Sequence, residues 1–584
     1  GGVCLSFISY SRVVGDMLDA TNSREEQSLR NRKQPAPDFP LDDNSKPSSR
    51  KKKKARRRKT KKQIAKAPSA TYYISAWVFG RIMGLLYLTA FISAWVQIHG
   101  LIGEGGISPI AEYFTRLSSA ISSPSNFLTH PSLFWINQSD LMLHAVCAIG
   151  AVSAFGLFLD VLPAICSFLC WFLFLSISIA GQSFFMYQWD LLLLESGFLM
   201  IFFHSFHWNW KPFSQNPRDF HPPDALFWLF RLLLFRIHFT RGIQELLSRD
   251  RIWRTLASFD FHFETQPSPT FLSYYLHRLP SLFHQGMVFW VLTVEVGVIF
   301  LIFGPQLFRR TACLYVLLLQ AFYMITGNFG TYHWNVCGLC LLLLDDAMFP
   351  DTIRKLTRVR RRTVQMRGAR KLSSSQPRLW HKRLAMSLAV VLIVLSTVPL
   401  SSIARNGIST PQPLRDVYKR VHPFRIVNLY GPFYRIPHER FELQIQGSMD
   451  AQQWLDYEFL YKPDVDVTRW PPLLSPHISR LEYQLWIAAQ TDYQQEVWIS
   501  RLLHRILEDS PGVVNLFRRE PFAAVPEYIR AVRYKYKFTT PGTSEGWWSR
   551  EFNDIYTPSF SQTVHSMSNR RKNLRSRIML RGSQ

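Results

Sequence analysis

The chain has 584 residues, of which 47% are hydrophobic and 15% aromatic, and they are gathered into blocks long enough to cross a lipid bilayer. This distribution excludes an ordinary soluble protein and predicts a membrane protein. The formal net charge of +27 is concentrated in basic clusters at 50–66, 354–383 and 570–581, two of which flank apolar runs. Because Lys and Arg beside membrane spans mark the cytosolic side, the charge predicts topology and contact with membrane lipids, not binding of nucleic acid.

The seven cysteines do not indicate a disulfide framework. Six of them lie in apolar runs. Cys337 and Cys340 have the spacing of a redox motif, but they stand beside 341–344, an all-leucine run, without the polar setting that lowers the pKa of a thiol. We therefore expect packing at these positions. The sequence predicts neither a metal site nor a cofactor.

Residues 1–70 are polar and then densely basic, which predicts a disordered cytosolic arm. No charge precedes the short apolar stretch 3–8, so a cleaved signal peptide is not expected. The first apolar run, 77–98, follows the basic arm and should therefore place 99–140 on the lumenal side of the membrane. That loop contains Asn137-Gln138-Ser139, an acceptor for N-glycosylation, and we predict that Asn137 carries a glycan.

Eight further apolar runs follow, and with the first they predict about nine crossings. They are 141–159, 161–179, 190–206, 225–247, 286–303, 311–325, 334–348 and 384–403. Nine crossings from a cytosolic N-terminus leave 248–285 and everything after 403 in the lumen. A pair of short runs, the third and fourth or the seventh and eighth, could instead be re-entrant without moving either terminus. Histidines 204, 207 and 221 near the fourth run indicate an aromatic interface belt in preference to a metal site.

Several apolar runs contain ionisable side chains, which are costly in lipid and must face other helices or a wet cavity. In the fifth run, positions 231, 238, 241 and 245 share one helical face, whereas Arg236 lies off that face. The predicted polar residues within the membrane are Asp190, Glu195, Arg231, His238, Arg241, Glu245 and Glu295.

Between the fifth and sixth runs stands a polar and aromatic segment, 253–280, that burial in lipid does not explain. Such a loop should be selected for what it touches. Pro267 and Pro269 fix their own φ and push the preceding residues out of the α region, so we expect a stiff, extended backbone that displays the side chains before it. The candidate residues for contact with a client protein are Trp253, His262, Glu264, Thr265, Gln266, Pro267 and Pro269. The alternative is that Glu264 and Gln266 only brace their own loop.

The character of the chain changes after 403. Apolar residues alternate with polar ones at 441–445, 457–461 and 532–538, which predicts half-buried strands. Residues 498–507 have helical spacing and end before Pro511-Gly512. Residues 404–560 should therefore form an independently folded, strand-rich lumenal domain, and 561–584 a disordered basic tail. The predicted fold class is a polytopic α-helical membrane protein with this terminal domain.

A set of motifs in a fixed order makes the chain resemble the lipase maturation factors of the endoplasmic reticulum. The resemblance covers about 72–558. The motifs are QWDLLLLESGFL at 188–199, HFETQPSP at 262–269, TGNFGTYHWN at 326–335, LLLLDD at 341–346, YEFLYKPDV at 457–465, PHISRLEYQLWIAA at 476–489, PEYIRAVRYKYKFT at 526–539 and WWSRE at 547–551.

The resemblance implies a resident membrane protein, not an enzyme, that helps secreted lipases or other secretory proteins to fold, dimerise and become active. On that interpretation the loop 248–285 and the terminal domain face the client chains. One alternative is an integral membrane enzyme resembling the vitamin K-dependent carboxylase, with His262 and Glu264 as an acid–base pair. A transporter is a further alternative, which only the charged fifth run favours.

Overall fold

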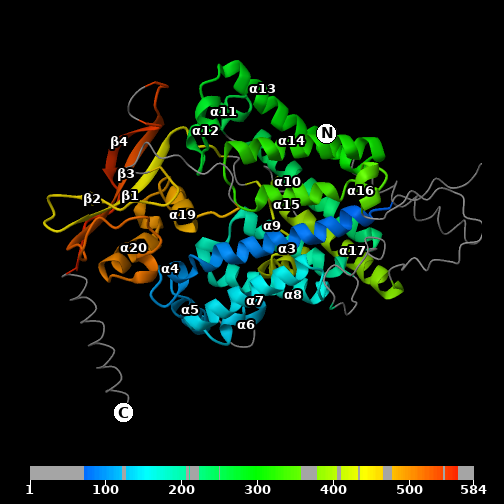
Figure 1. The fold of residues 1–584 in the computed structure, drawn as a ribbon, viewed down its shortest axis with the longest axis horizontal. Coiled ribbons are helices and arrows are strands. Elements are labelled where there is room, and N and C mark those ends of the chain that lie inside the picture. Colours follow the sequence, from blue (N-terminus) through cyan, green and yellow to red (C-terminus); the bar gives the residue numbers. More distant parts are fainter. Residues whose placement is uncertain are drawn as a thin grey trace, which may run out of the picture. The chain divides into compact units, whose positions relative to one another are not determined.

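The computed structural model describes residues 71–120, 126–204, 210, 222–248, 250–356, 378–403, 410–431, 435–463, 476–542 and 546–562. The predicted arm 1–70, the tail after 562 and most of the three basic clusters lie outside the described residues, as do His207 and His221. From residue 71 onward the described chain belongs to one compact unit, in which a helical bundle is followed by further helices and a small sheet (Figure 1).

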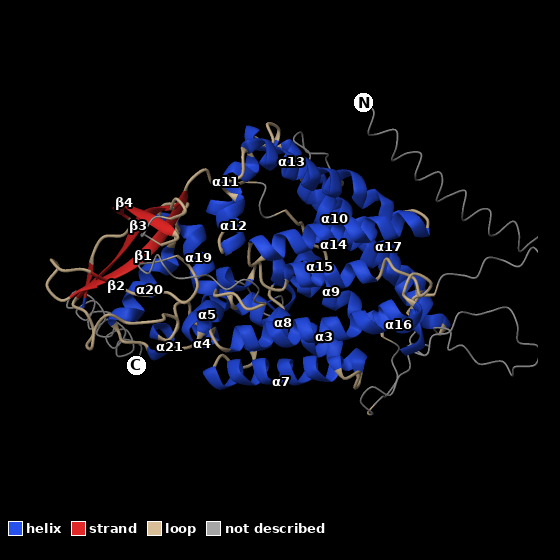
Figure 2. Cartoon of the chain, turned by 45° about the horizontal axis from the view of Figure 1, so that its top comes forward, coloured by secondary structure: helices blue, strands red, loops and turns tan. Residues whose placement is uncertain are grey.

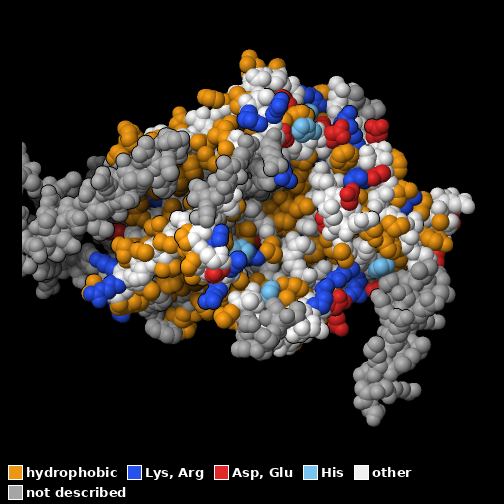
Figure 3. Space-filling view, turned by 180° about the vertical axis from the view of Figure 1, so that it is seen from behind, with side chains coloured by type: hydrophobic (Ala, Val, Ile, Leu, Met, Phe, Trp, Pro, Cys, Tyr) orange, Lys and Arg blue, Asp and Glu red, His pale blue; other side chains and the backbone are white. Residues whose placement is uncertain are grey.

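Six helical segments in the described part are long and apolar enough to cross a membrane. They are α3 (Tyr73–Trp95), α7 (Asp140–Phe158), α8 (Pro163–Ala180), Ser281–Phe303, α14 (Gln306–Thr326) and α17 (Leu379–Ser401). The fourth of these is built from α13 (Ser281–Leu292), a π-helical turn η5 (Thr293–Gly297) and a 3-10 segment η6 (Val298–Phe303). Large apolar side chains stay exposed on α7, α13, α14 and α17, and Figure 3 shows broad hydrophobic areas on one face of the molecule. The chain is therefore a polytopic helical membrane protein.

The other three predicted crossings correspond to α9 (Gln188–Phe203), α10 (Asp224–Leu247) and α15 (Tyr332–Leu341). Helix α9 has 16 residues and α15 only 10, whereas α10 has 24 but carries several charges. Helices α9 and α15 pack on each other and on α3, and both contact α10, so Figure 2 shows them within the bundle. Ionisable side chains such as Glu195 and Arg236 are buried there because apolar helices surround them.

Short helices connect the bundle. They are α4 (Ile98–Ile102), α5 (Ile110–Ala120), α6 (Asn126–Thr129), η1 (Leu133–Trp135), η2 (Gln182–Phe185), η4 (Arg251–Trp253), α11 (Ser258–Thr265), α12 (Phe271–Leu276), α16 (Asp351–Leu356), α18 (Gln412–Val421) and η7 (His422–Phe424). The predicted extended segment before Pro267 is therefore wrong in part, because His262, Glu264 and Thr265 lie on α11. Only from Gln266, with φ −62° and ψ 154°, is the backbone extended, as the proline after it requires.

The terminal region contains an antiparallel sheet in the order β2-β1-β3-β4, with β5 also pairing with β3. The strands are β1 (Arg440–Ser448), β2 (Leu455–Asp456), β3 (Tyr528–Phe538), β4 (Trp548–Ile555) and β5 (Phe560–Ser561), and the helices are α19 (Arg480–Ala488), η8 (Tyr493–Gln495), α20 (Val497–Leu507) and α21 (Pro511–Val514). The register pairs Arg440 with Tyr536 and Phe538 with Trp548.

The strands predicted at 441–445 and 532–538 and the helix predicted at 498–507 are confirmed. The strand predicted at 457–461 is wrong. Tyr457 and Phe459 alternate because both are buried against Phe517, and only an isolated bridge between Glu458 and Arg519 forms there.

Candidate functional site

A buried ion pair joins the terminal region to the membrane bundle. Arg480, the first residue of α19, donates two hydrogen bonds to the Asp190 carboxylate, at 2.8 and 2.7 Å, and a third to the carbonyl of Phe184 at 2.8 Å. Both charged side chains are buried. The nearby Tyr187 hydroxyl donates to the Gln484 side chain at 2.6 Å. Asp190, predicted as a polar residue within the membrane, therefore anchors α19 on the first turn of α9.

A second buried arginine, Arg440, binds the backbone of the segment 253–280. Arg440 on β1 is fully buried, and its guanidinium donates to the carbonyls of Glu264, Gln266 and Pro267 and to the carboxylate of Glu442. The same segment receives a hydrogen bond from the Trp486 indole to the Thr265 carbonyl at 3.0 Å. Because a guanidinium has five donors in a fixed fork, this one side chain holds three carbonyls within residues 264–267 against the sheet.

The predicted contact residues are packed inside this junction. Trp253, His262, Thr265, Gln266, Pro267 and Pro269 are buried. Gln266 donates to the Ser273 hydroxyl and the Thr326 carbonyl, both at 2.9 Å, and the half-buried Glu264 accepts a hydrogen bond from the backbone N–H of Phe538 at 3.0 Å. The expected display of these side chains on the surface is wrong, and the geometry favours the alternative in which they brace the structure.

The acid–base pair that the enzyme alternative would need does not form. Glu264 approaches the ring of His277 at 3.5 Å, not His262. Burial, with a smaller effect from Arg241, lowers the pKa of His262 to about 3, so this imidazole is neutral near neutral pH. Neither residue is therefore poised to exchange a proton with the other.

The polar side chains of α10 fall into two groups. Arg236 forms a bidentate pair with Glu195, at 2.8 and 3.1 Å, and donates to the carbonyl of Asn428 at 2.7 Å. Glu195 also accepts from the backbone N–H of Asn428 and the hydroxyl of Tyr430. The chain around 426–431 is thereby held against α9 and α10, where Thr240 also donates to the Tyr430 carbonyl.

The second group lies on the predicted face of α10. Arg241 donates to Glu245 at 3.0 Å and to the Tyr323 hydroxyl at 2.6 Å, and its Nε lies 3.4 Å from Glu295. His238 lies 4.0 Å from Glu295, which stands in the π-helical turn η5. The shared face of 238, 241 and 245 is confirmed. Arg231, farther along the same face, donates instead to the Tyr72 hydroxyl.

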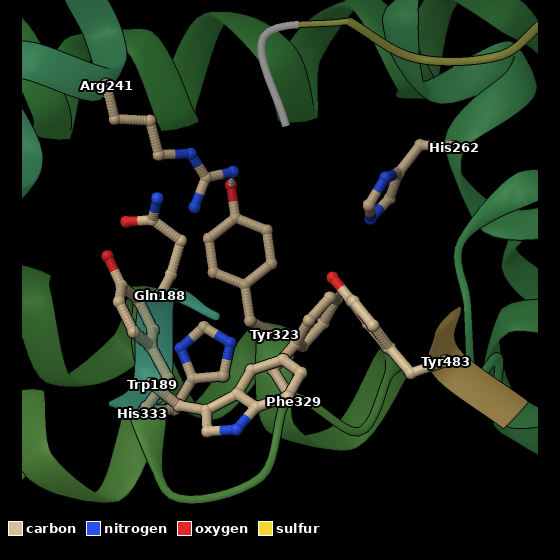
Figure 4. A pocket seen from close by; sticks show the side chains of 9 residues that line it. Gln188, Trp189, Arg241, His262, Tyr323, Phe329, His333 and Tyr483 are labelled. Atoms are coloured by element: carbon tan, nitrogen blue, oxygen red, sulfur yellow. Dashed lines mark hydrogen bonds between the residues drawn. The ribbon is translucent and has the colours of Figure 1, made fainter. Parts of the chain in front are cut away.

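Beside Arg241 lies a small cavity with about 20 Å³ of free volume, enough for a water-sized molecule. Figure 4 shows the rings of Tyr323, Tyr483 and His262 pointing into it. His262 Nε2, Gln188 Oε1 and Trp189 Nε1 are buried without a hydrogen-bond partner among the described residues. The arrangement can hold small polar molecules such as water. The lining residues are Gln188, Trp189, Arg241, His262, Tyr323, Phe329, Tyr332, His333 and Tyr483. No cluster of three or more metal-ligating side chains occurs in the described ranges.

Asn137 is exposed in the turn before α7. Its side-chain oxygen accepts from the backbone N–H of Ser139 at 2.8 Å, and the Ser139 hydroxyl caps α7 by accepting from Met142 at 3.3 Å. This exposure is compatible with a glycan, and the modification itself stays a prediction.

Sequence reasoning missed four residues that organise the junction: Arg440, Arg480, Asn428 and Tyr430. A signal for Arg480 was present, because Asp190 inside an apolar run requires a buried cation and Arg480 opens an apolar helix. Asn428 and Tyr430 carry no such signal, since nothing local shows that this part of the chain packs on α9 and α10.

The fold defines a class of protein, a polytopic membrane bundle with a strand-rich C-terminal domain that buried ion pairs fix to it. Two family models match the chain: the lipase maturation factor transmembrane domain over 74–351 and the lipase maturation factor C-terminal domain over 426–558. The chain belongs to the lipase maturation factor family.

Relatives match over most of their length. Lipase maturation factor 1 of Bos taurus is 31% identical, over 86% of this chain and 91% of the relative. The Homo sapiens protein of the same name is also 31% identical, over 84% and 89%, and lipase maturation factor 2 of Xenopus laevis is 27% identical, over 83% and 82%. No solved structure matches the chain.

Proposed function

We propose that this protein is a membrane factor that assists the folding, dimer assembly and maturation of secreted lipases or related secretory proteins. The observation that carries the proposal is the match to lipase maturation factor 1, which spans both the bundle and the terminal domain. None of the relatives cited above is named as an enzyme or a transporter, so those two alternatives are not favoured.

The protein resides in the membrane of the endoplasmic reticulum, with nine crossings, a cytosolic N-terminus and a lumenal terminal domain. Contacts of the terminal domain support this placement. Ser510 donates to the Gly105 carbonyl, Asn328 donates to the His477 carbonyl, and Arg440 binds the segment after α11. These contacts involve three connections, at 99–140, 248–285 and 327–333, that lie on the lumenal side if the chain makes the nine predicted crossings.

These contacts support separate roles for the two domains. The membrane domain, 71–403, holds the terminal domain, 404–560, at a fixed position, and the terminal domain meets the client chains. The segment 253–280 contributes through Arg440 by fixing that position. The arm 1–70 and the tail 561–584 add basic charge outside both domains.

The test is complementation in cells that lack their own lipase maturation factors. Expression of the chain should raise the secreted lipase activity per unit of lipase mass. Equal specific activity with and without the chain, at verified membrane insertion, would contradict the proposal. Turnover of a lipid-soluble small molecule by the purified protein, without any effect on lipase, would favour the enzyme alternative.

A further inference from the structure

Helix α18 is an amphipathic helix that follows the last apolar span. Leu414, Tyr418 and Val421 lie at helical spacing and rest on the hydrophobic core, and α18 packs against α17. Its other face is exposed and carries Arg415, Lys419 and Arg420. Val417, between the two faces, is 47% exposed.

Contacts place α18 beside the end of α17. The Tyr418 hydroxyl donates to the Val427 carbonyl at 3.3 Å, and the following residues bind Arg236. Arg236 also donates to Ser396 of α17, five residues before that helix ends at Ser401. Five residues of helix correspond to about 8 Å. Helix α18 is therefore held near the level at which a spanning helix leaves the hydrocarbon layer.

The positive charge of the exposed face is largely uncompensated. Arg415 donates to Gln412, and the single carboxylate of the helix, Asp416, accepts from the same Gln412. Lys419 and Arg420 have no ion-pair partner within the part of the chain that the structure describes. In the proposed topology this flank is lumenal, where the rule that places cations on the cytosolic side does not account for them. Another interaction is needed to explain an exposed basic helix face at the lumenal edge of the hydrocarbon layer.

We propose that α18 lies in the headgroup layer and binds anionic phospholipid headgroups through Arg415, Lys419 and Arg420, with Val417 at the boundary of the acyl chains. A basic amphipathic helix parallel to the membrane is the arrangement that such a surface stabilises. Each cation near an anionic surface strengthens binding about fivefold. The bound lipid fixes the end of α17 and the chain that runs on to Asn428.

The test compares three full-length proteins reconstituted in phosphatidylcholine with or without phosphatidylserine. They are the wild type, the reversal variant R415E/K419E/R420E and the control R518E/R519E/K537E, which reverses three exposed cations of the terminal domain. The basic clusters at 50–66 and 354–383 are the same in all three, so differences between them isolate α18. The measurements are the phosphatidylserine retained after detergent exchange and the thermal unfolding midpoint.

The reversal variant should retain less phosphatidylserine than the wild type and the control, and phosphatidylserine should raise its unfolding midpoint less. A fourth protein, the neutral variant R415Q/K419Q/R420Q, should fall between the wild type and the reversal variant in both measurements. It keeps the test usable if charge reversal prevents insertion. Equal retention in all proteins would overturn the proposal. So would stabilisation of the wild type by inorganic phosphate in phosphatidylcholine alone, which indicates a free anion site, or lost lipase co-precipitation at unchanged lipid retention, which indicates an acidic polypeptide partner.

Discussion

At the scale of single residues, a buried carboxyl makes stability depend on pH. Glu482 in α19 accepts hydrogen bonds from the backbone N–H groups of Leu460, Tyr461 and Lys462, yet burial raises its pKa to about 7. The folded state therefore holds the proton more tightly than the unfolded chain does. Stability should fall as pH rises from about 4.5 to 7, by about 3 kcal/mol in total, and then change no further on this account.

The variant E482Q should flatten that pH dependence of the thermal unfolding midpoint in detergent. E439Q removes an exposed carboxyl just before β1 and should keep the wild-type dependence. If the unfolding midpoint of E482Q fell with pH between 5 and 7 as steeply as that of the wild type, another group would be responsible for the pH dependence.

Asn137 gives the sharpest residue-level test of topology. Its exposed amide should receive a glycan if the turn before α7 is lumenal. After expression in microsomes, N137Q should migrate faster than the wild type and lose its sensitivity to glycosidase. Identical mobility of the two proteins would remove the main support for a lumenal 99–140.

At the scale of elements, the bonds made by the end of α11 and by Gln266 after it predict how these residues act. Removing both side chains in E264A/Q266A deletes the bond to Phe538 and those to Ser273 and Thr326. Each bond lost from a buried group costs about 1–3 kcal/mol. Protein abundance, protease resistance and secreted lipase activity should therefore decrease together. Normal abundance with reduced client co-precipitation would instead indicate that this segment contacts clients directly.

Local patterns explain what could be predicted of these elements. The period of two in β1 and β3 and the helical period in α20 arise from burial on one side of each element, so the sequence alone reports them. The local pattern does not report the burial of Thr265 and Gln266, because Trp486 and Arg440 bind their carbonyls from about two hundred residues away in the chain. The prolines correctly predicted the extended backbone from Gln266 onward but could not show what would cover it.

At the scale of the whole molecule, buried polar side chains of the terminal region bond to partners in the membrane bundle and its connecting segments. Arg480, Arg440 and Asn428 all find partners on the other side of the junction. The period-two pattern predicted an independently folded domain, because it reports strands and not their partners. Expressed alone, 404–560 would leave these groups unpaired, so we now expect it to lack a cooperative unfolding transition. A sharp transition with dispersed amide shifts would contradict this.

The most direct test of the central claim, that the two regions work as one folded unit in lipase maturation, is the secreted lipase activity supported by R480Q. Removing one partner of a buried pair costs about 3–5 kcal/mol, because the remaining Asp190 charge stays buried. R480Q should lower the unfolding midpoint and the specific activity of secreted lipase, whereas R519Q, at a site 74% exposed, should leave both unchanged. An R480Q protein with wild-type midpoint and wild-type lipase activity would contradict the account.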